Sequence, residues 1–182
     1  ASAKLHVLAT DGATLRLQQR IAMEANWAGN LTTVGADLYV GLDGGKWMDS
    51  KWVRLSPLER WRFDAGGLSL QARTDPAVYG NCYVVGDKVY VGVGAGMVVL
   101  DPVSLVPLRV FDTDQATDNL CRFALRQEPG QPPRFIRAND RSVFAQRIEG
   151  SSLRTIGSAA LPWSEKRRTV GSVRDAAGDA AV

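Results

Sequence analysis

The 182 residues carry 22 basic and 19 acidic side chains, a formal net charge of +3, and 45% of them are hydrophobic. This length suits one domain with its own core, the composition excludes a disordered chain, and the charge excess is too small to indicate nucleic-acid binding. One histidine (His6) and two cysteines (Cys82 and Cys121) are too few for an ordinary zinc site or a histidine-based catalytic triad. No apolar stretch is long enough for a membrane-spanning helix.

Two apolar runs, residues 4–8 and 14–21, open the chain and predict two strands, which form half of a four-stranded unit over residues 1–28. A complete unit follows over residues 29–64, where runs rich in Val, Tyr and Trp alternate with Gly, Asp and Pro. Its four expected strands are 31–34, 38–42, 52–55 and 60–63. Residues 65–79 are expected to form a long connection to the next unit.

An internal repeat links residues 29–41 to residues 80–92, with seven of thirteen positions identical. The match includes Gly-Asn at the start, Val-Gly in the middle and Tyr-Val-Gly at the end, and such a match without a gap indicates repeated structure. The second copy opens a unit over residues 80–112, and a more divergent unit spans residues 119–157. The strands expected in these two units are 81–85, 88–93, 97–100, 107–111, 120–125, 134–137, 143–147 and 153–156.

Four-stranded antiparallel units every 40–50 residues or so are the sequence pattern of a β-propeller. We therefore predict an all-β fold over residues 1–157, a propeller-like array of about four four-stranded blades, complete or partial; a sandwich or barrel is the alternative. Residues 158–182 are poor in strand formers and are expected to be flexible or to close the first blade. If they do not close it, another chain or the remainder of a larger propeller completes the ring, and the chain is expected to self-associate.

The third unit, through Val85–Gly92 and Val98–Pro102, resembles blades of the quinoprotein-like and YVTN-type propeller superfamily, where a strand pair ends in a Leu-Asp-Pro turn before the outer strand. The resemblance is best over residues 29–112 and implies a fold, not an activity. Quinoprotein dehydrogenases of this superfamily often place adjacent cysteines beside their cofactor. Cys82 and Cys121 lie 39 residues apart, so that motif is absent. They form one disulfide or stay two free thiols, and their apolar surroundings favour the thiols.

The loop over residues 42–51 is the main functional candidate, because it is an insertion relative to the third unit and is rich in glycine and polar residues. Exposed Trp and Met side chains often anchor protein interfaces. In a propeller this loop shares a face with the connections between blades, which predicts a binding face. Its candidate residues are Trp47, Met48, Asp49, Trp27, Arg73 and Asp75. The alternative is that Trp47 packs back over its own blade.

Three carboxylates, Asp112, Asp114 and Asp118, crowd one connection and are weak candidates for a calcium site. The glycine and terminal glutamate of an EF-hand loop are missing, so an ordinary solvated loop is the favoured interpretation.

We predict a non-catalytic binding or scaffold module that mediates protein–protein assembly through its loop face and needs no cofactor. One alternative is a fragment of a quinoprotein-like dehydrogenase or calcium-dependent hydrolase. A second is an RNA-associated scaffold, suggested by the arginines of the last unit; few aromatic residues accompany them, so nucleic acid is the less favoured partner. The sequence indicates no compartment.

Overall fold

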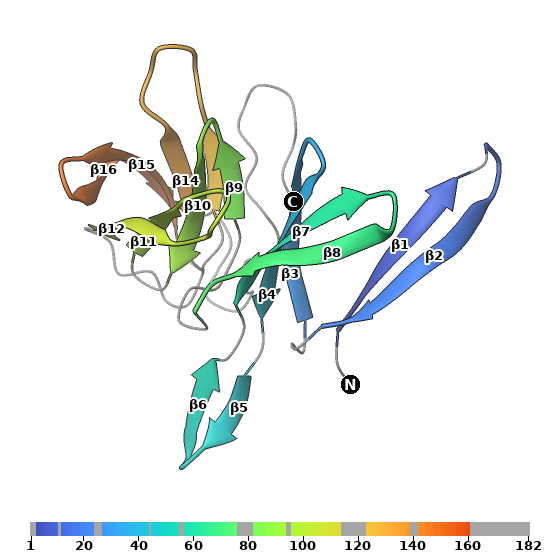
Figure 1. Ribbon diagram of the computed structural model, residues 1–182. Coiled ribbons are helices and arrows are strands. Elements are labelled where there is room, and N and C mark those ends of the chain that lie inside the picture. Colours follow the sequence, from blue (N-terminus) through green and yellow to red (C-terminus); the bar gives the residue numbers. More distant parts are fainter. Residues whose placement is uncertain are drawn as a thin grey trace. The chain divides into compact units, whose positions relative to one another are not determined.

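The computed structural model describes residues 3–10, 12–23, 27–43, 45–54, 57–75, 82–93, 96–113, 123–138 and 142–160. Sixteen strands occupy most of these residues, and none of them is helical (Figure 1). The prediction of an all-β fold is therefore confirmed. The chain divides into two compact units, residues 1–89 with 100–106 and residues 90–99 with 107–182.

The first unit contains a four-stranded antiparallel sheet and two hairpins. The sheet runs in the order β3 (Trp27–Val34), β4 (Asp37–Asp43), β7 (Leu58–Asp64) and β8 (Gly67–Arg73). The hairpin of β1 (Lys4–Thr10) and β2 (Leu15–Ala22) precedes it, which confirms the two strands expected at the start of the chain. The second hairpin, β5 (Gly45–Met48) and β6 (Lys51–Arg54), is inserted between β4 and β7 as a sheet of its own.

The order of strands in this sheet differs from the prediction. We expected residues 52–55 to be its third strand, but β6 pairs with β5 alone. The third strand is β7, which we expected to be the fourth, and the fourth is β8, which lies in the expected connection 65–79. The sheet therefore continues past residue 64. An inserted hairpin has the same alternating pattern as a blade strand, so the pattern alone could not separate them.

A second sheet has eight strands in the order β13-β14-β15-β16-β12-β11-β10-β9. Its strands are β9 (Cys82–Val85), β10 (Lys88–Val93), β11 (Gly96–Leu100), β12 (Pro107–Thr113), β13 (Phe123–Arg126), β14 (Arg134–Ala138), β15 (Ser142–Glu149) and β16 (Ser152–Ala160). All eight overlap the strands expected in this half of the chain. We expected two separate blades, and the strands do form two meanders, β9–β12 and β13–β16. The last strands of these meanders, β12 and β16, are joined into one sheet by a short parallel pairing of Asp112 and Thr113 with Ser152 and Leu153.

The core of the second unit depends on a close approach between β11 and β12. Gly96 is buried, and a Cβ atom at this position would clash with the backbone carbonyl oxygen of Phe111. Aromatic rings fill the space further along the sheet, where Phe135 packs against Tyr90 and Phe123 with ring centroids 5.7 and 5.9 Å apart.

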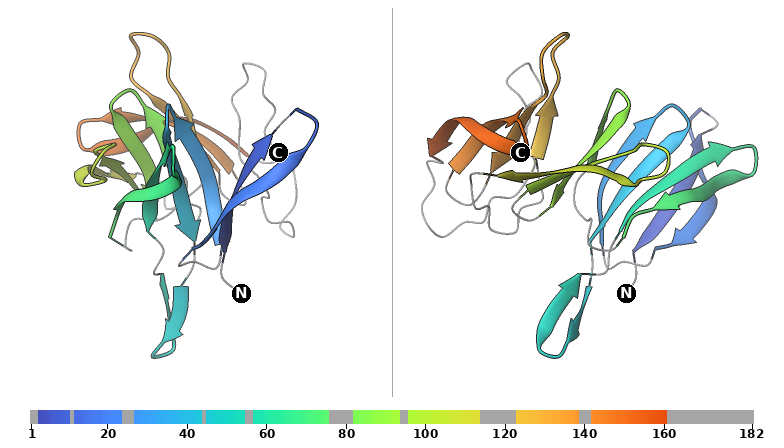
Figure 2. Two further views of the ribbon diagram at one scale, coloured as in Figure 1. Left: turned by 45° about the vertical axis from the view of Figure 1, so that its right-hand side comes forward. Right: turned by 60° about the vertical axis from the view of Figure 1, so that its left-hand side comes forward.

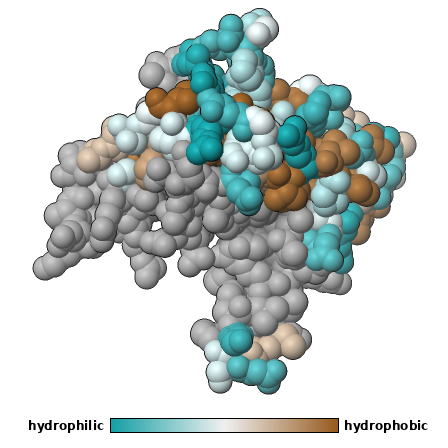
Figure 3. Space-filling view, turned by 90° about the vertical axis from the view of Figure 1, so that its left-hand side faces the viewer, coloured by the Kyte–Doolittle hydropathy of each residue, from teal (hydrophilic) through white to brown (hydrophobic). Residues whose placement is uncertain are grey.

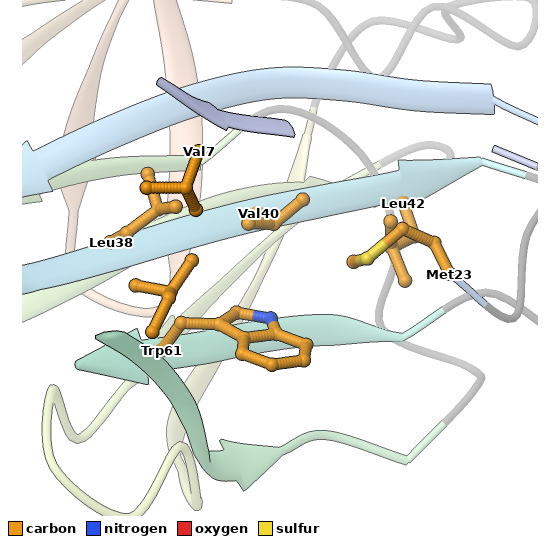
Figure 4. Close-up of a cluster of buried hydrophobic side chains, with 7 residues drawn as sticks. Val7, Met23, Leu38, Val40, Leu42 and Trp61 are labelled. Carbon is orange, nitrogen blue, oxygen red and sulfur yellow. The ribbon is translucent and has the colours of Figure 1, made fainter. Parts of the chain in front are cut away.

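The core of the first unit lies between the β1–β2 hairpin and one face of the four-stranded sheet. Val7 of β1 and Met23, just after β2, meet a row of apolar side chains from β4 (Figure 4). The buried cluster consists of Val7, Met23, Leu38, Val40, Leu42, Trp61 and Leu68. The odd-numbered side chains of β1 thus face the sheet, since side chains alternate along a strand.

The β1–β2 hairpin repeats the β7–β8 hairpin residue for residue, 53 positions earlier. His6 pairs with Arg20 as Glu59 pairs with Arg73, and each ladder shifts register by one residue at the same place, between Val7 and Leu8 or between Arg60 and Trp61. The sequences agree at the equivalent positions Leu5 and Leu58, Leu15 and Leu68, Leu17 and Leu70, Gln18 and Gln71, and Arg20 and Arg73. The two hairpins are therefore copies of one structural element.

Candidate functional site

The β5–β6 hairpin leaves the four-stranded sheet between β4 and β7 and extends away from it (Figures 1 and 2). Its ladder pairs Trp47 with Trp52 and Met48 with Lys51. The two residues of the turn, Asp49 and Ser50, have φ angles of 49° and 62°. Two consecutive positive φ angles are characteristic of a type I′ turn, which suits the twist of a two-residue hairpin.

The tip of this hairpin is exposed and chemically mixed. Met48 is 43% exposed, and Asp49, Ser50 and Lys51 are exposed beside it. Figure 3 shows the tip at the bottom of the view, where hydrophilic (teal) and more hydrophobic (pale brown) residues lie side by side. The side chain of Trp47 lies outside the described part of the structure, so the alternative that it packs back over its sheet stays a prediction.

The base of the hairpin is fixed by buried residues on both sides. Leu42 and Leu58 are fully buried, and the backbone N–H of Leu42 donates to the carbonyl of Pro57 at 3.3 Å. The N–H of Leu58 donates to Oγ1 of Thr74 at 2.8 Å, and the N–H of Thr74 donates to the carbonyl of Leu58 at 2.9 Å. The hairpin thus projects from a buried, hydrogen-bonded part of the sheet.

The other candidate binding residues lie at the same end of the four-stranded sheet. Trp27 pairs in register with Asp43, the last residue of β4, and Arg73 pairs with Glu59 near the start of β7. Asp75 follows two residues later and is exposed. The structure therefore brings Trp27, Arg73 and Asp75 to the end of the sheet from which the hairpin projects.

Arg73 also has a structural role that the sequence did not indicate. Its guanidinium lies 2.6 Å from Oε1 of Glu59, whose side chain is only 1% exposed. The other oxygen, Oε2, accepts a hydrogen bond from Nε1 of Trp61 at 2.9 Å. A buried carboxylate needs such partners to offset its desolvation. Arg73 is therefore partly committed to holding Glu59, although 38% of its side chain remains exposed.

The carboxylates considered for calcium are only partly described. Asp112 is exposed at the end of β12, whereas Asp114 and Asp118 lie outside the described residues. Within the described part of the chain, no group of three or more His, Cys, Asp or Glu side chains could hold a metal ion. Among these same residues no helix is long and apolar enough to cross a membrane.

The Leu-Asp-Pro turn, residues 100–106, belongs to the first unit and is held by side chains of its sheet. The hydroxyl of Tyr39 donates to the carbonyl of Pro102 at 2.9 Å, and the guanidinium of Arg60 donates to the carbonyl of Val103. Within the turn, Asp101 accepts hydrogen bonds from the backbone N–H of Ser104 at 2.7 Å and from its hydroxyl at 2.8 Å. The hydrogen bonds from Ser104 lower the pKa of Asp101.

An ion-pair cluster next to this turn ties β4 to β7. The carboxylate of Asp37 accepts two hydrogen bonds of 2.9 Å from the guanidinium of Arg62 and lies 3.3 Å from Nε of Arg60. The hydrogen bond from Arg62 is the main reason that the pKa of Asp37 lies below its ordinary value. The charged residues of β7, which was predicted as the strand 60–63, are therefore accommodated by their neighbours in the sheet.

Two side-chain amides fasten neighbouring elements of the first unit. Gln19 donates to the carbonyl of Leu68 at 3.1 Å and accepts from its N–H at 2.9 Å. Asn30 does the same with Cys82, at 2.7 and 2.9 Å. Asn30 belongs to the repeated Gly-Asn, so the repeat was a signal for this contact. Cys82 is a free, buried thiol, and burial raises its pKa to about 12.

No protein-family model matches the sequence, and no curated protein matches it. Among solved structures, the chain is similar to BamB from Moraxella catarrhalis, a β-propeller protein, with a TM-score of 0.54 and 13% sequence identity. The alignment covers 93% of this chain and 51% of BamB, so the chain spans about half the length of that protein. At this identity the likeness supports a propeller-like fold and does not extend to the quinoprotein superfamily, which the sequence had suggested.

Proposed function

We propose that the chain is a non-catalytic, propeller-like binding module that assembles with another protein through the tip of the β5–β6 hairpin. The observation that carries the proposal is the insertion of a hairpin with an exposed tip, residues 48–51, between two adjacent strands of one sheet whose flanking residues Leu42 and Leu58 are buried. We also propose that the four-stranded sheet and the two meanders act as blades of a propeller. The likeness to BamB supports the fold of this scaffold and leaves its partner open.

The shape of the hairpin favours a binding role over a packing role. A two-stranded hairpin is only marginally stable in water unless a further surface covers it. In addition, Asp49 and Ser50 both occupy the left-handed region, which costs energy for residues other than glycine. A partner that packs against the ladder would stabilise the arm and offset this cost.

The composition of the tip indicates the chemistry of the partner. Met48 offers a flexible apolar side chain, and Asp49 and Lys51 flank it with charges of both signs. Hot-spot residues in interfaces are usually apolar or aromatic anchors surrounded by polar contacts. We therefore expect a partner protein with a small apolar pocket and a mixed polar rim, not a uniformly charged polymer such as RNA.

Site-specific photo-crosslinking tests this proposal in the organism from which the sequence comes. A benzophenone amino acid at Met48 should give one dominant cross-linked protein, identified by mass spectrometry. The matched control places the same group at Asp87, an exposed turn residue whose side chain is 87% exposed and which lies outside the hairpin. No adduct at Met48, or the same adducts at both positions, would contradict a binding role for the hairpin.

Variants of the hairpin separate binding from folding. Trp47→Ala should weaken formation of the cross-linked complex while the free energy of unfolding stays within about 0.5 kcal/mol of the parent. A large loss of stability would instead favour the alternative in which Trp47 covers its own sheet. Ser50→Gly serves as the opposite control, because glycine adopts the left-handed conformation of Ser50 without strain. This variant leaves Met48, Asp49 and Lys51 unchanged and should keep the complex intact.

A further inference from the structure

We infer a second interaction surface, distinct from the β5–β6 hairpin: the free edge of β1 accepts an antiparallel strand from another polypeptide. The argument rests on the equivalence of β1–β2 with β7–β8. In the four-stranded sheet, β7 is paired on both sides, by β8 and by β4. In the β1–β2 sheet, no described strand pairs with the outer edge of β1 (Figure 2).

The direction of the backbone groups on β1 follows from one backbone hydrogen bond. The N–H of Met23 donates to the carbonyl of Ala3 at 2.9 Å, so odd-numbered residues of β1 direct their backbone polar groups toward β2. The even-numbered residues His6 and Leu8 therefore direct theirs away from β2, at the free edge. Unpaired N–H and C=O groups on an edge strand are a template for a further strand.

The equivalent edge of β7 shows which strand fits. The N–H of Phe63 donates to the carbonyl of Ala36 at 2.9 Å, which places the odd-numbered residues of β7 toward β4. In register, Leu38 of β4 lies opposite Trp61, and Val40 lies opposite Glu59. Since Trp61 and Glu59 correspond to Leu8 and His6, the strand on β1 would place an apolar residue opposite each of these two positions.

The exposed face of β1–β2 also matches an apolar strand. Leu8 and Leu15 are 52% and 72% exposed, whereas their equivalents Trp61 and Leu68 are 8% and 4% exposed within the core. On β4, Leu38, Val40 and Leu42 share the face of Trp61 in that core. A strand of the same pattern on β1 would extend the Leu8–Leu15 face. The occupant is thus an extended segment with apolar residues at alternate positions.

A synthetic peptide with the sequence of residues 36–42 of this chain is the probe. With the full chain, nuclear magnetic resonance should show slower hydrogen exchange at the amides of His6 and Leu8 as the peptide is added. N-methylation of the peptide at the residues corresponding to Leu38 and Val40 removes the N–H groups that face β1, and should abolish the effect. N-methylation at the residue corresponding to Tyr39 is the matched control, because that N–H faces away.

A variant of the protein tests the same edge from the other side. His6→Pro removes an outward N–H and leaves the inward groups of β1 intact, so the hairpin should remain folded while peptide binding weakens about tenfold or more. The inference is overturned if neither the unmodified peptide nor the control peptide methylated at the Tyr39 position slows exchange at His6 and Leu8. It is equally overturned if these amides are already protected in the chain alone, because its own residues or a second copy would then occupy the edge.

Discussion

The hairpins β7–β8 and β1–β2 are one structural element in two surroundings. The first is paired along its inner edge by β4, and its Trp61 face is covered by Val7 of the other hairpin. The second has no described strand on that edge, and the equivalent face is exposed at Leu8 and Leu15. The difference teaches that local sequence determines the hairpin and its bulge, whereas neighbouring strands determine which of its side chains are buried.

The comparison predicts its largest difference at Trp61 and Leu8, which occupy equivalent positions. Trp61→Ala should lower the free energy of unfolding by about 3–5 kcal/mol, because it empties part of the buried cluster. Leu8→Ala should cost less than about 1 kcal/mol, since Leu8 is half exposed. Urea denaturation measures both values. Equal losses would mean that the Leu8 face is covered in solution, and Trp61→Phe separates packing from the hydrogen bond to Glu59.

A smaller difference is expected at Glu59 and its equivalent, His6. Glu59→Ala removes the partner of Arg73 and the acceptor for Trp61, and we expect a loss of about 1–3 kcal/mol. His6→Ala should change the stability by less than about 0.5 kcal/mol, because His6 is exposed. Thermal unfolding of both variants under identical conditions provides the measurement. A neutral Glu59→Ala would show that this buried pair contributes nothing net.

The contact between the two hairpins can be weakened by one substitution. Gln19→Ala removes both hydrogen bonds to the backbone of Leu68, and the residue equivalent to Gln19 in β8 is already Ala72. We expect a loss of about 1–2 kcal/mol in urea denaturation. Gln71→Ala is the matched control, because that amide is exposed and, among the described residues, donates hydrogen bonds to its near neighbour Ser69. If Gln71→Ala were as destabilising as Gln19→Ala, the contact would have no special role.

The smallest expected effect is a pH dependence of the free energy of unfolding, caused by Asp37 in the ion-pair cluster between β4 and β7. The pKa of Asp37 is lowered in the folded chain. Just below pH 3.8, the carboxylate of Asp37 is therefore still charged in the folded chain, whereas it is already largely protonated in the unfolded chain. Its contribution to stability is therefore present above the ordinary pKa of 3.8 and lost as the pH falls through the lowered value. Asp37→Asn should lose less stability between neutral and acid pH than the parent. Identical acid profiles would contradict this account of Asp37.

Much of the architecture was predictable from sequence, because the repeat marks strands by their alternation and turns by their glycines. The eight strands from residue 82 to residue 160 overlap their predicted positions. The error in the earlier unit has a physical cause: residues 51–54 alternate like a blade strand, yet they pair only within an inserted hairpin. The charges of Glu59, Arg60 and Arg62 favoured an outer strand for this segment, but it is the third strand of the sheet. These charges are accommodated there by Asp37 and Arg73, and a single sequence does not show that pairing.

The candidate binding residues were placed with mixed success. Alternation and the insertion identified the segment that forms the hairpin, and propeller topology predicted that Trp27, Arg73 and Asp75 share a face with it. Arg73 was expected in a connection, but it is the last residue of β8. The ion pair between Arg73 and Glu59 depends on a register that a single sequence does not contain. The half unit at the start of the chain was predicted from the repeat, but the sequence did not show which strand has no described neighbour, because the equivalence of β1 with β7 appears only when both ladders and their shared bulge are compared.

Hydrogen exchange at the two equivalent edges tests the central comparison most directly. In the full chain alone, residue-resolved exchange should be slower at Glu59 and Trp61 of β7 than at His6 and Leu8 of β1, by about a hundredfold or more, because β4 covers only the first pair. This result would establish that β1 presents an open edge on a hairpin whose copy is fully paired. Equal protection at the two edges would contradict the account, because β1 would then already have a strand beside it.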